Sequence, residues 1–339
     1  TQLQFGIEQA LPFPGKLGLK ERAAEFDADA ASSNVDEARL LLIRNVKQTW
    51  WQIFYLDRAL ETVTRNQNLL RQFVEIARTR YTVGEGLQQE VLLAQVELSR
   101  LFDRQVQLQG MRGEQAARLN ALLAHGAGTP VVLPGEVNDV LARPQPEAKL
   151  YMRAEASRPL LEQRRQEIEA ARARRDFAER DRYPDFSLGA AYGFRQGENA
   201  DGSSRPDFAS VRLGMSLPLY AGSKQDKAVD QRTSELLQKR YALQDEWNKV
   251  QAEIAAALAD YQRASEQVQL FRTGIIPQAR QSVASMLSGY QVNKVDFLNL
   301  VRSQVTLYDY ETQYWKSFSE ANQALARLAA AVGGEVSDE

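Results

Sequence analysis

Residues that could carry out catalysis or hold a metal ion are few and scattered in this 339-residue chain. It has no cysteine, which excludes a disulfide framework, a thiolate metal site and a cysteine nucleophile. Its one histidine, His125, excludes a multi-histidine site and stands where a helix is expected to end, a place that favours a cation. The methionines lack the clustering of a soft-metal site: Met111, Met152, Met215 and Met286. We therefore predict no enzyme, no catalytic residues, no cofactor and no metal site.

The charge balance and the hydropathy pattern exclude two further classes of protein. The chain has 42 Lys and Arg against 44 Asp and Glu, a net charge of −2. A protein that binds nucleic acid through phosphate neutralisation needs a basic surplus, so no nucleic-acid partner is expected. No apolar run approaches the ~20 residues of a transmembrane helix, which excludes an inner-membrane protein.

The first half of the chain predicts very long helices. Residues 17–80 contain no proline, and one helix over them would span roughly 95 Å. Residues 80–90 carry two glycines and predict a tight turn, after which residues 88–124 predict a second helix. Residues 125–146 contain Gly and Pro and predict a linker. A shorter helix is expected over 158–182, with Pro159 in its first turn.

Three segments instead alternate between apolar and other residues with a period of two, which predicts β-strands: residues 3–11, 184–195 and 208–220. Their apolar positions include Leu3, Phe5, Ile7, Phe186, Leu188, Tyr192, Phe194, Val211, Leu213, Met215, Leu217 and Leu219. Half of a soluble sandwich is the ordinary interpretation of any one such strand. Three strands attached to very long helices, however, are too few to build a sandwich.

The second half predicts another pair of long helices. The first extends to about residue 289, and Gly274 and Pro277 are expected to kink or break it. A turn over 290–296 leads to a helix over 297–332, which ends at Gly333.

This last helix carries two apolar stripes: Leu298, Val301, Val305, Tyr308 and Trp315 in one, and Leu300, Leu307 and Tyr314 in the other. Two stripes predict neighbours on both sides, as in a cylinder of helices, with an ordinary antiparallel bundle as the alternative.

The two halves of the chain match each other. In each half a Leu-Pro segment, at Leu11 and at Leu217, joins a strand to a long helix. Downstream, Tyr81-Thr82-Val83 aligns with Tyr290-Gln291-Val292 at an offset of 209 residues. We interpret this as a duplicated unit of strand, long helix, turn and helix. The second copy has an additional helix and outgoing strand, so we expect their counterparts to precede Thr1 in the full protein.

Four segments together resemble the TolC-type outer-membrane efflux family: LPFPGK, YTVGEGLQQEVLLAQ, YPDFSLGAAYG and YQVNKVDFLNLVRSQ. The resemblance extends over essentially the whole chain, and the repeated Tyr-containing turn followed by a Gln-containing helix is its most specific part. The Phe-Pro-Gly-Lys after the first strand is similar to the branch that exports heavy-metal cations. One departure is Asn293, at a position where the family usually has Gly.

The resemblance implies a mainly α fold, in which duplicated antiparallel hairpins form a periplasmic α-barrel and a few strands contribute to a small transmembrane β-barrel. It implies a homotrimer in the outer membrane of a Gram-negative bacterium, in contact with outer-membrane lipid. The protein would passively conduct metal cations or drugs to the exterior. Its partners would be a periplasmic adaptor (a membrane fusion protein) and an inner-membrane pump of the RND type.

The resemblance also assigns candidate sites. The two hairpin turns would dock the adaptor, through Val83, Gly84, Glu85, Gly86, Asn293, Lys294, Val295 and Asp296. Just inside them, Glu90, Asn299 and Arg302 would line the aperture, since a residue repeated about a three-fold axis becomes a ring. The alternative is that Glu90 and Arg302 are solvated or paired between helices.

The expected organisation is a strand at 1–15, a first hairpin at 16–125, an equatorial linker at 126–157, a helix at 158–183, a strand pair at 184–220, a second hairpin at 221–333 and a tail at 334–339. The alternative function is that of a soluble periplasmic coiled-coil adaptor or scaffold. An adaptor, however, would carry lipoyl-like and barrel modules around one hairpin, whereas here two hairpins flank one strand pair.

Overall fold

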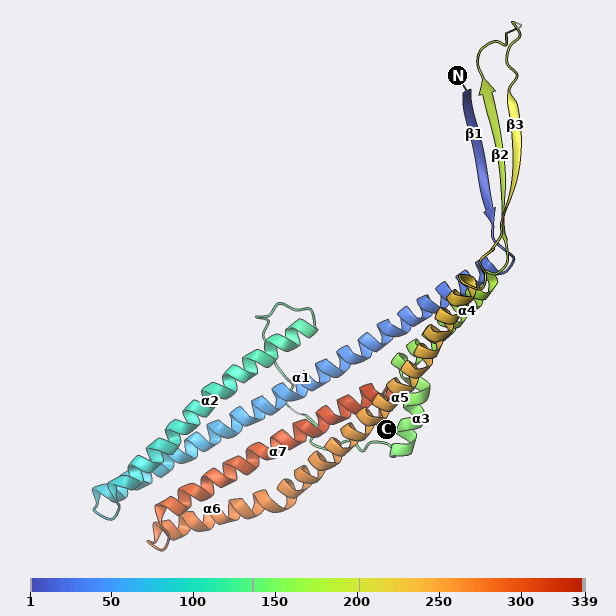
Figure 1. Ribbon diagram of the computed structural model, residues 1–339. Coiled ribbons are helices and arrows are strands. Elements are labelled where there is room, and N and C mark those ends of the chain that lie inside the picture. Colours follow the sequence, from blue (N-terminus) through green and yellow to red (C-terminus); the bar gives the residue numbers. More distant parts are fainter. Residues whose placement is uncertain (1, 136, 201, 337–339) are drawn as a thin grey trace. The chain divides into compact units, whose positions relative to one another are not determined.

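The computed structural model describes residues 2–135, 137–200 and 202–336, and its elements are predominantly helical (Figure 1). They are, in chain order, β1 (Gln2–Leu11), α1 (Lys16–Thr82), α2 (Gln88–Leu122), α3 (Glu147–Ser157), α4 (Pro159–Arg180), β2 (Asp185–Arg195), β3 (Phe208–Ser216), α5 (Gln225–Leu270), the π-helical turn η1 (Phe271–Ile275), α6 (Ile276–Gln291) and α7 (Phe297–Val332). The chain divides into two compact units. Unit 1 comprises residues 1–37 and 159–248, and unit 2 comprises residues 38–158 and 249–339.

Unit 1 contains an antiparallel sheet in the order β1-β2-β3 (Figure 1). Its register sets Phe5 opposite Tyr192, and Leu188 opposite Leu213. Because side chains alternate along a strand, this register gathers the apolar side chains of all three strands on one face. We call this the apolar face, and all its large members are exposed: Leu3, Phe5, Ile7, Leu11, Phe186, Leu188, Tyr192, Phe194, Val211, Leu213 and Met215.

The opposite face of the sheet carries small and polar residues, apart from Phe208 at the start of β3. A Cβ atom on Gly193 would lie 2.2 Å from the ring of Phe208, so glycine is required where that ring crosses β2. The Arg195 guanidinium lies over the same ring, 4.8 Å from its centroid. The two faces therefore differ sharply in character, as the period-two pattern predicted.

Strand β3 ends at Ser216, four residues earlier than predicted. Pro218 has no N–H group to donate and restricts the backbone of Leu217, so it disfavours continuation of the ladder. The Leu219 amide donates to the Leu217 carbonyl instead (3.0 Å). The sequence prediction that Leu217 and Leu219 belong to the strand face was therefore wrong, although both side chains are exposed.

A buried lysine joins the strands of unit 1 to its helices. Lys16, in the first turn of α1, is 3% exposed, and its Nζ lies 2.8 Å from Asp185 and 3.0 Å from Asp181. Asp185 also accepts from the Phe13 amide (2.8 Å), and the Phe13 ring stacks on Tyr183 at 4.5 Å. Burial disfavours the charged amine, but the two carboxylates more than compensate, so the pKa of Lys16 is raised.

Helix α4 is held to the unit 1 part of α5 by ion pairs and a small apolar cluster, and to α1 by the ion pair of Arg174 with Asp27. Arg164 bonds to Glu246 (3.1 Å), and Lys239 bonds to Glu167 (2.9 Å). The buried cluster consists of Ile168, Ala171 and Leu236. These contacts align the helices that begin or end beside the sheet.

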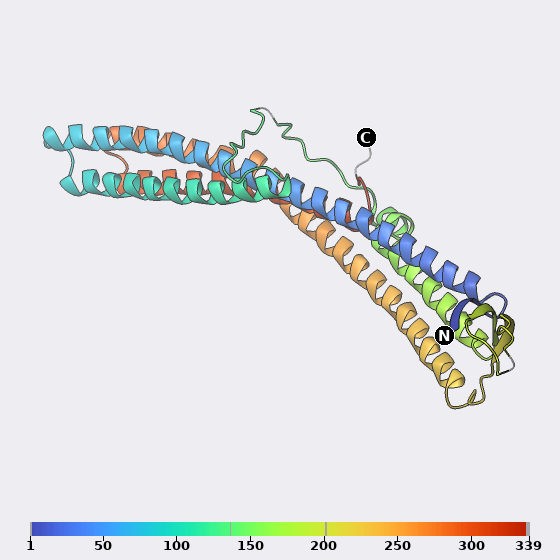
Figure 2. The ribbon, with the colours of Figure 1, turned by 90° about the horizontal axis from the view of Figure 1, so that it is seen from above.

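Unit 2 contains two antiparallel hairpins: α6 and α7 lie side by side in Figure 1, and α1 and α2 do so in Figure 1 and in Figure 2. We call α1 from residue 38 onward with α2 "hairpin 1", and α6 with α7 "hairpin 2". Leu300, Leu307 and Tyr314 from one predicted stripe of α7 are buried, and so is Val301 from the other. The prediction that α7 has neighbours on both sides is thus confirmed.

Helix α5 does not continue straight into α6. A π-helical turn, η1, occupies residues 271–275, immediately before Pro277. Proline lacks the N–H of a regular helical bond and its ring clashes with the carbonyl four residues earlier, so an extra residue per turn relieves the conflict. The predicted break at Gly274 and Pro277 is confirmed.

The segment expected as a linker is partly helical and is bonded to α2 and α5. Helix α3 lies at its end and is separated from α4 only by Arg158, whose extended backbone is the one favoured before Pro159. Upstream, Asn120 donates to the Thr129 carbonyl (2.8 Å), and Tyr261 donates to the Ala142 carbonyl (2.6 Å). The helical content of α3 was not predicted.

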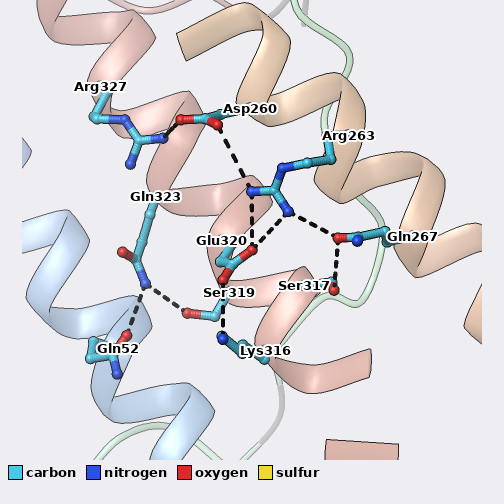
Figure 3. A network of polar contacts seen from close by, with 10 residues as sticks. All are labelled: Gln52, Asp260, Arg263, Gln267, Lys316, Ser317, Ser319, Glu320, Gln323 and Arg327. Atoms are coloured by element: carbon cyan, nitrogen blue, oxygen red, sulfur yellow. Dashed lines mark hydrogen bonds and ion pairs between the residues drawn. The ribbon is translucent and has the colours of Figure 1, made fainter. Parts of the chain in front are cut away.

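A polar network fixes the register of α5, α7 and α1 within unit 2 (Figure 3). Arg263 bonds to Glu320 (3.2 Å) and to Gln267 (3.0 Å). Gln323 of α7 donates to Gln52 of α1 (3.2 Å), and Arg327 bonds to Asp260 (2.6 Å). The charged members are partly exposed, so each pair contributes little by itself, but together they specify how the helices align.

Among the described residues, no helix combines the length and the apolarity needed to cross a membrane.

Candidate functional site

The turn of hairpin 1 is short and built around one left-handed residue. Helix α1 ends at Thr82 and α2 begins at Gln88. Gly84 has φ +77°, a conformation that glycine adopts without strain. The Gly84 amide donates to the Tyr81 carbonyl (3.1 Å), and the Glu85 amide donates to the Arg80 carbonyl (2.9 Å).

The turn of hairpin 2 repeats this arrangement 209 residues later. Asn293 has φ +61° and takes the place of Gly84, which is tolerable because asparagine enters the left-handed region more readily than other side chains. Its amide donates to the Tyr290 carbonyl (3.1 Å), and the Lys294 amide donates to the Gly289 carbonyl (2.9 Å). These are the counterparts of the bonds in the first turn. The internal repeat inferred from the sequence is therefore confirmed at the level of individual hydrogen bonds.

The structure joins the two turns through a tyrosine. Tyr290 is 2% exposed, and its hydroxyl donates to Oε2 of Glu90 (2.9 Å). Arg80 donates to the Tyr290 carbonyl (2.8 Å), and its guanidinium lies 4.6 Å from the centroid of the Tyr290 ring. Burial first, and then the neighbouring Glu90 carboxylate, raises the pKa of Tyr290 to about 12. The phenol therefore remains a hydrogen-bond donor throughout the physiological pH range.

The residues expected at the tips all lie in the two turns. Val83, Gly84, Glu85, Asn293, Lys294 and Asp296 are exposed, whereas Gly86 and Val295 are half-buried. Val295 packs against Gly289, where a Cβ atom would lie 2.5 Å from its side chain. Six of the eight residues are thus accessible to a partner.

The three expected aperture residues differ in their surroundings. Glu90 is half-buried, and its carboxylate accepts a hydrogen bond from the Tyr290 hydroxyl of α6. Asn299 and Arg302 lie in the first turns of α7, and both are exposed. Sequence reasoning missed the bond between Tyr290 and Glu90. The tyrosine that recurs in both turns was the available signal for this bond. It did not single out Tyr290, because Tyr81 occupies the same repeat position and is exposed.

Further polar contacts run along the interface of the two hairpins below the tips. Gln304, which is buried, donates to Asn66 (2.6 Å). Glu311 accepts from Arg280 (2.6 Å) and lies 3.5 Å from Arg65. Buried polar groups of this kind specify one alignment of helices when they are satisfied.

Among the described residues, no three or more His, Asp or Glu side chains lie together in a group that could hold a metal ion. His125 is exposed and lies three residues beyond the end of α2. The arrangement at the tips therefore offers hydrogen bonding, charge and packing, the means by which helices bind partners or restrict a pore.

Comparison with known proteins gives a consistent result over almost the whole chain. A family model described as "Outer membrane efflux protein" matches residues 1–125 and 150–334. The outer membrane efflux protein BepC of Brucella suis is 24% identical over 311 residues, which cover 86% of this chain and 66% of BepC. The chain thus spans just under two thirds of the length of that relative.

Solved structures show the same fold. The outer membrane protein VceC of Vibrio cholerae matches with a TM-score of 0.83 and 20% identity, covering 98% of this chain and 80% of VceC. The open state of the Neisseria gonorrhoeae MtrE outer membrane channel matches with a TM-score of 0.81 and 16% identity, covering 98% and 80%. The predicted mainly helical fold, with long hairpins and a small β contribution, is confirmed.

Proposed function

The chain belongs to the outer membrane efflux protein family, and on that basis we propose that the full protein is the outer-membrane exit duct of a tripartite efflux system. Its sheet would contribute to a β-barrel in the outer membrane of a Gram-negative bacterium. Its hairpins would contribute to a periplasmic α-barrel, and three copies would close both. The duct conducts passively, and we propose no catalytic step in it.

The apolar face of the sheet is the observation that carries this proposal. Ile7, Val211 and Leu213 are 77%, 79% and 75% exposed, although large apolar side chains seldom cluster in water. Apart from Phe208, the residues of the opposite face are small or polar, as in the interior of an outer-membrane barrel. A sheet with these two faces fits a site between lipid and an aqueous lumen. A soluble adaptor or scaffold gives no reason for such a face and is not favoured.

The test of this function is transport by the full-length protein in its own cell. Deleting the gene should increase cellular accumulation of the exported compounds, and restoring it should reverse the increase. Purified protein in planar bilayers should conduct ions without an energy source. Protein that is extracted without detergent and shows no conductance would contradict the proposal.

The exported compounds are proposed at the level of class: metal cations or drugs. The Phe-Pro-Gly-Lys segment, with Lys16 at its end, favours heavy-metal cations. Measuring how sensitive the deletion strain is to a panel of metal cations and drugs distinguishes the two classes. Sensitivity to organic compounds alone would contradict the assignment to metal cations.

We propose that the tips dock a periplasmic adaptor, which connects the duct to an inner-membrane pump of the RND type. The exposed turn residues would make this contact, and Lys294 and Asp296 in one turn and Glu85 in the other provide charge of both signs. Glu90, Asn299 and Arg302 would line the aperture behind them.

Arg302→Glu should change single-channel conductance and ion selectivity in bilayers while leaving trimer assembly intact. Arg302 is exposed, so its charge is available to ions, and charge rings set the selectivity of pores. Reversal from three positive to three negative charges should shift selectivity towards cations. Glu90→Lys should shift selectivity in the opposite direction and also break the bond to Tyr290.

Tyr290→Phe is the control that separates the two effects of the Glu90 substitution. It removes the hydroxyl bonded to Glu90 but keeps the carboxylate, so it should raise conductance without reversing selectivity. Because the pKa of Tyr290 is about 12, its hydroxyl should stay protonated, and so remain a donor, between about pH 6 and 9. Conductance unchanged in all three variants would remove these residues from the aperture.

A further inference from the structure

Unit 2 contains a cavity of about 230 Å³ whose walls come from both hairpins. Helices α1 and α2 contribute Leu70 and Leu101, and α7 contributes Val305, so much of the wall is apolar. A mainly apolar wall with a few polar groups is typical of small-molecule sites. The volume lies below the roughly 300–1,000 Å³ of pockets for drug-sized ligands, so an occupant would be smaller than a drug.

Two side chains of α7 that border this cavity each have a polar atom without a partner. Gln304 is 3% exposed, and its Nε2 donates to Oδ1 of Asn66 (2.6 Å). Asn66 in turn donates through Nδ2 to the Thr62 carbonyl (2.9 Å), which can only accept. This sequence of bonds fixes the orientation of the Gln304 amide and leaves its Oε1 unpaired among the described residues. One turn further along α7, the buried hydroxyl of Tyr308 is unpaired among them as well.

Unpaired buried polar atoms are rare in folded proteins, because each one has lost its hydrogen bonds to water and gained none in return. Here two of them occur one helical turn apart, beside the same cavity. A molecule in that cavity is therefore the partner that the chain itself does not provide.

The charged residues of the cavity wall indicate the charge of that molecule. Arg100 is paired with Glu97, and Arg104 donates to Gln107 (3.2 Å). Asp309 is exposed and has no hydrogen bond to a described residue. Surrounding atoms raise the pKa of its carboxyl, and the positive charge of Arg104 offsets this only in part. Asp309 is thus the charged group that an occupant could still pair with, and it favours a cation.

The three free groups of the wall can all accept hydrogen bonds: the amide oxygen of Gln304, the hydroxyl of Tyr308 and the carboxylate of Asp309. An ammonium group has three donors and no acceptor, so it matches this set. A carboxylate would instead be repelled by Asp309 and could not donate to the amide oxygen. The apolar part of the wall requires that the ammonium be attached to an apolar body.

We propose that this cavity binds a small organic amine, a primary ammonium carried by a single ring. The ammonium donates to Gln304 and Tyr308, Asp309 balances its charge, and the ring packs against Leu101 and Val305. The occupant contacts helices of both hairpins and so stabilises the contact between them. This site goes beyond the proposed exit duct and does not depend on it.

Isothermal titration of the full-length protein in detergent with 2-phenylethylamine tests the site. We expect saturable binding of one amine per chain, after subtraction of a titration into detergent alone. The probe 3-phenylpropionate has a similar apolar ring but a carboxylate in place of the ammonium. It should bind at least about tenfold more weakly, because hydrogen bonds to charged groups contribute most to such a difference.

Tyr308→Phe separates a binding role of the hydroxyl from a structural one. The affinity for the amine should fall about three- to tenfold, the usual effect of losing one hydrogen bond. The melting temperature should stay the same or rise, because the hydroxyl has no partner among the described residues. Tyr310→Phe is the matched control on the same helix, where the Tyr310 ring lies 6.1 Å from that of Phe271 and does not border the cavity. It should leave the affinity unchanged.

Asp309→Asn should lower the affinity for the amine about tenfold and reduce the preference over the carboxylate probe. Asp103→Asn is its control, since Asp103 is an exposed carboxylate of α2 that accepts from Gln107 (2.8 Å) and lies outside the cavity wall. Val305→Trp fills the cavity and should abolish binding, which provides a further variant if Tyr308→Phe does not fold.

Binding that does not saturate, or equal affinity for the two probes, would overturn the inference. Equal effects within either pair of matched variants, or affinity retained in Val305→Trp, would do so as well. A lower melting temperature of Tyr308→Phe would assign the hydroxyl a structural bond and also contradict the site. Failure of the proposed duct is distinguishable, because it appears as absent conductance of the unmodified protein whether or not the amine binds.

Discussion

The Lys16→Met variant should unfold at a lower temperature than the native protein, by roughly 4–8 °C. Lys16 has a buried side chain that binds Asp181 and Asp185, and methionine fills similar volume without the charge. Removing the lysine leaves Asp181 and Asp185 without their cation, but both carboxylates remain in contact with water. We therefore expect a loss of about 2 kcal/mol, below the usual cost of breaking a fully buried pair. Circular dichroism during heating measures the change.

Lys20→Met is the matched control, because Lys20 lies one turn further along α1 and is exposed, with its amine 5.0 Å from the centroid of the Phe177 ring. Its expected effect is below about 1 kcal/mol. A raised pKa in the folded state means that the stabilisation from Lys16 is fully present below the unfolded pKa and is lost as pH rises through the folded one. The deficit of Lys16→Met should therefore be constant from about pH 6 to 9. Equal effects of the two substitutions would contradict the proposed role of Lys16.

Local patterns in the sequence predicted most elements closely. Helix α7 begins at Phe297 and ends at Val332, as predicted, because Gly333 adopts φ +87° and closes the helix in the left-handed conformation. The strands β1 and β2 follow the period-two segments. These features depend on residues close together in the chain, so the periodicity and the turn residues contain the necessary information.

Contacts between distant segments were not predictable in the same way. Tyr81 and Tyr290 have the same repeat position and the same residue type, yet one is exposed and the other is buried. The difference arises from which neighbours the rest of the chain provides. The bridge from Lys16 to Asp185 likewise joins residues 169 positions apart. No pattern within the sequence indicates that Lys16 is buried between two carboxylates.

Helix α3 and the end of β3 show a third limit. Glu147–Ser157 lies between a Pro-containing linker and Pro159, and its short length gives a weak periodic signal. The alternation after Ser216 continues through Leu217 and Leu219, so the pattern extended the strand although Pro218 ends it. In both cases one proline set the boundary more strongly than the pattern of apolar residues did.

Leu213→Arg in the full-length protein should sharply reduce assembly into the outer membrane. Leu213 is 75% exposed on the apolar face, opposite Leu188 in the central strand. If this face meets lipid, as we propose, a charge there costs about 2–4 kcal/mol near the middle of the bilayer and little near its edges. Three copies in a trimer multiply this cost. The measurement is the fraction of protein recovered as trimer from outer-membrane preparations.

Ser210→Arg is the matched control, because it lies on the same strand with its side chain on the opposite face. That face already carries Arg212, so another arginine would enter a polar environment. Assembly of this variant should remain close to that of the native protein. The two variants have the same strand, the same introduced residue and the same net charge, and they differ in the face of the sheet that carries the arginine. Equal loss of trimer in both variants would show that the apolar face does not meet lipid, whereas loss in Leu213→Arg alone would assign this face to the membrane.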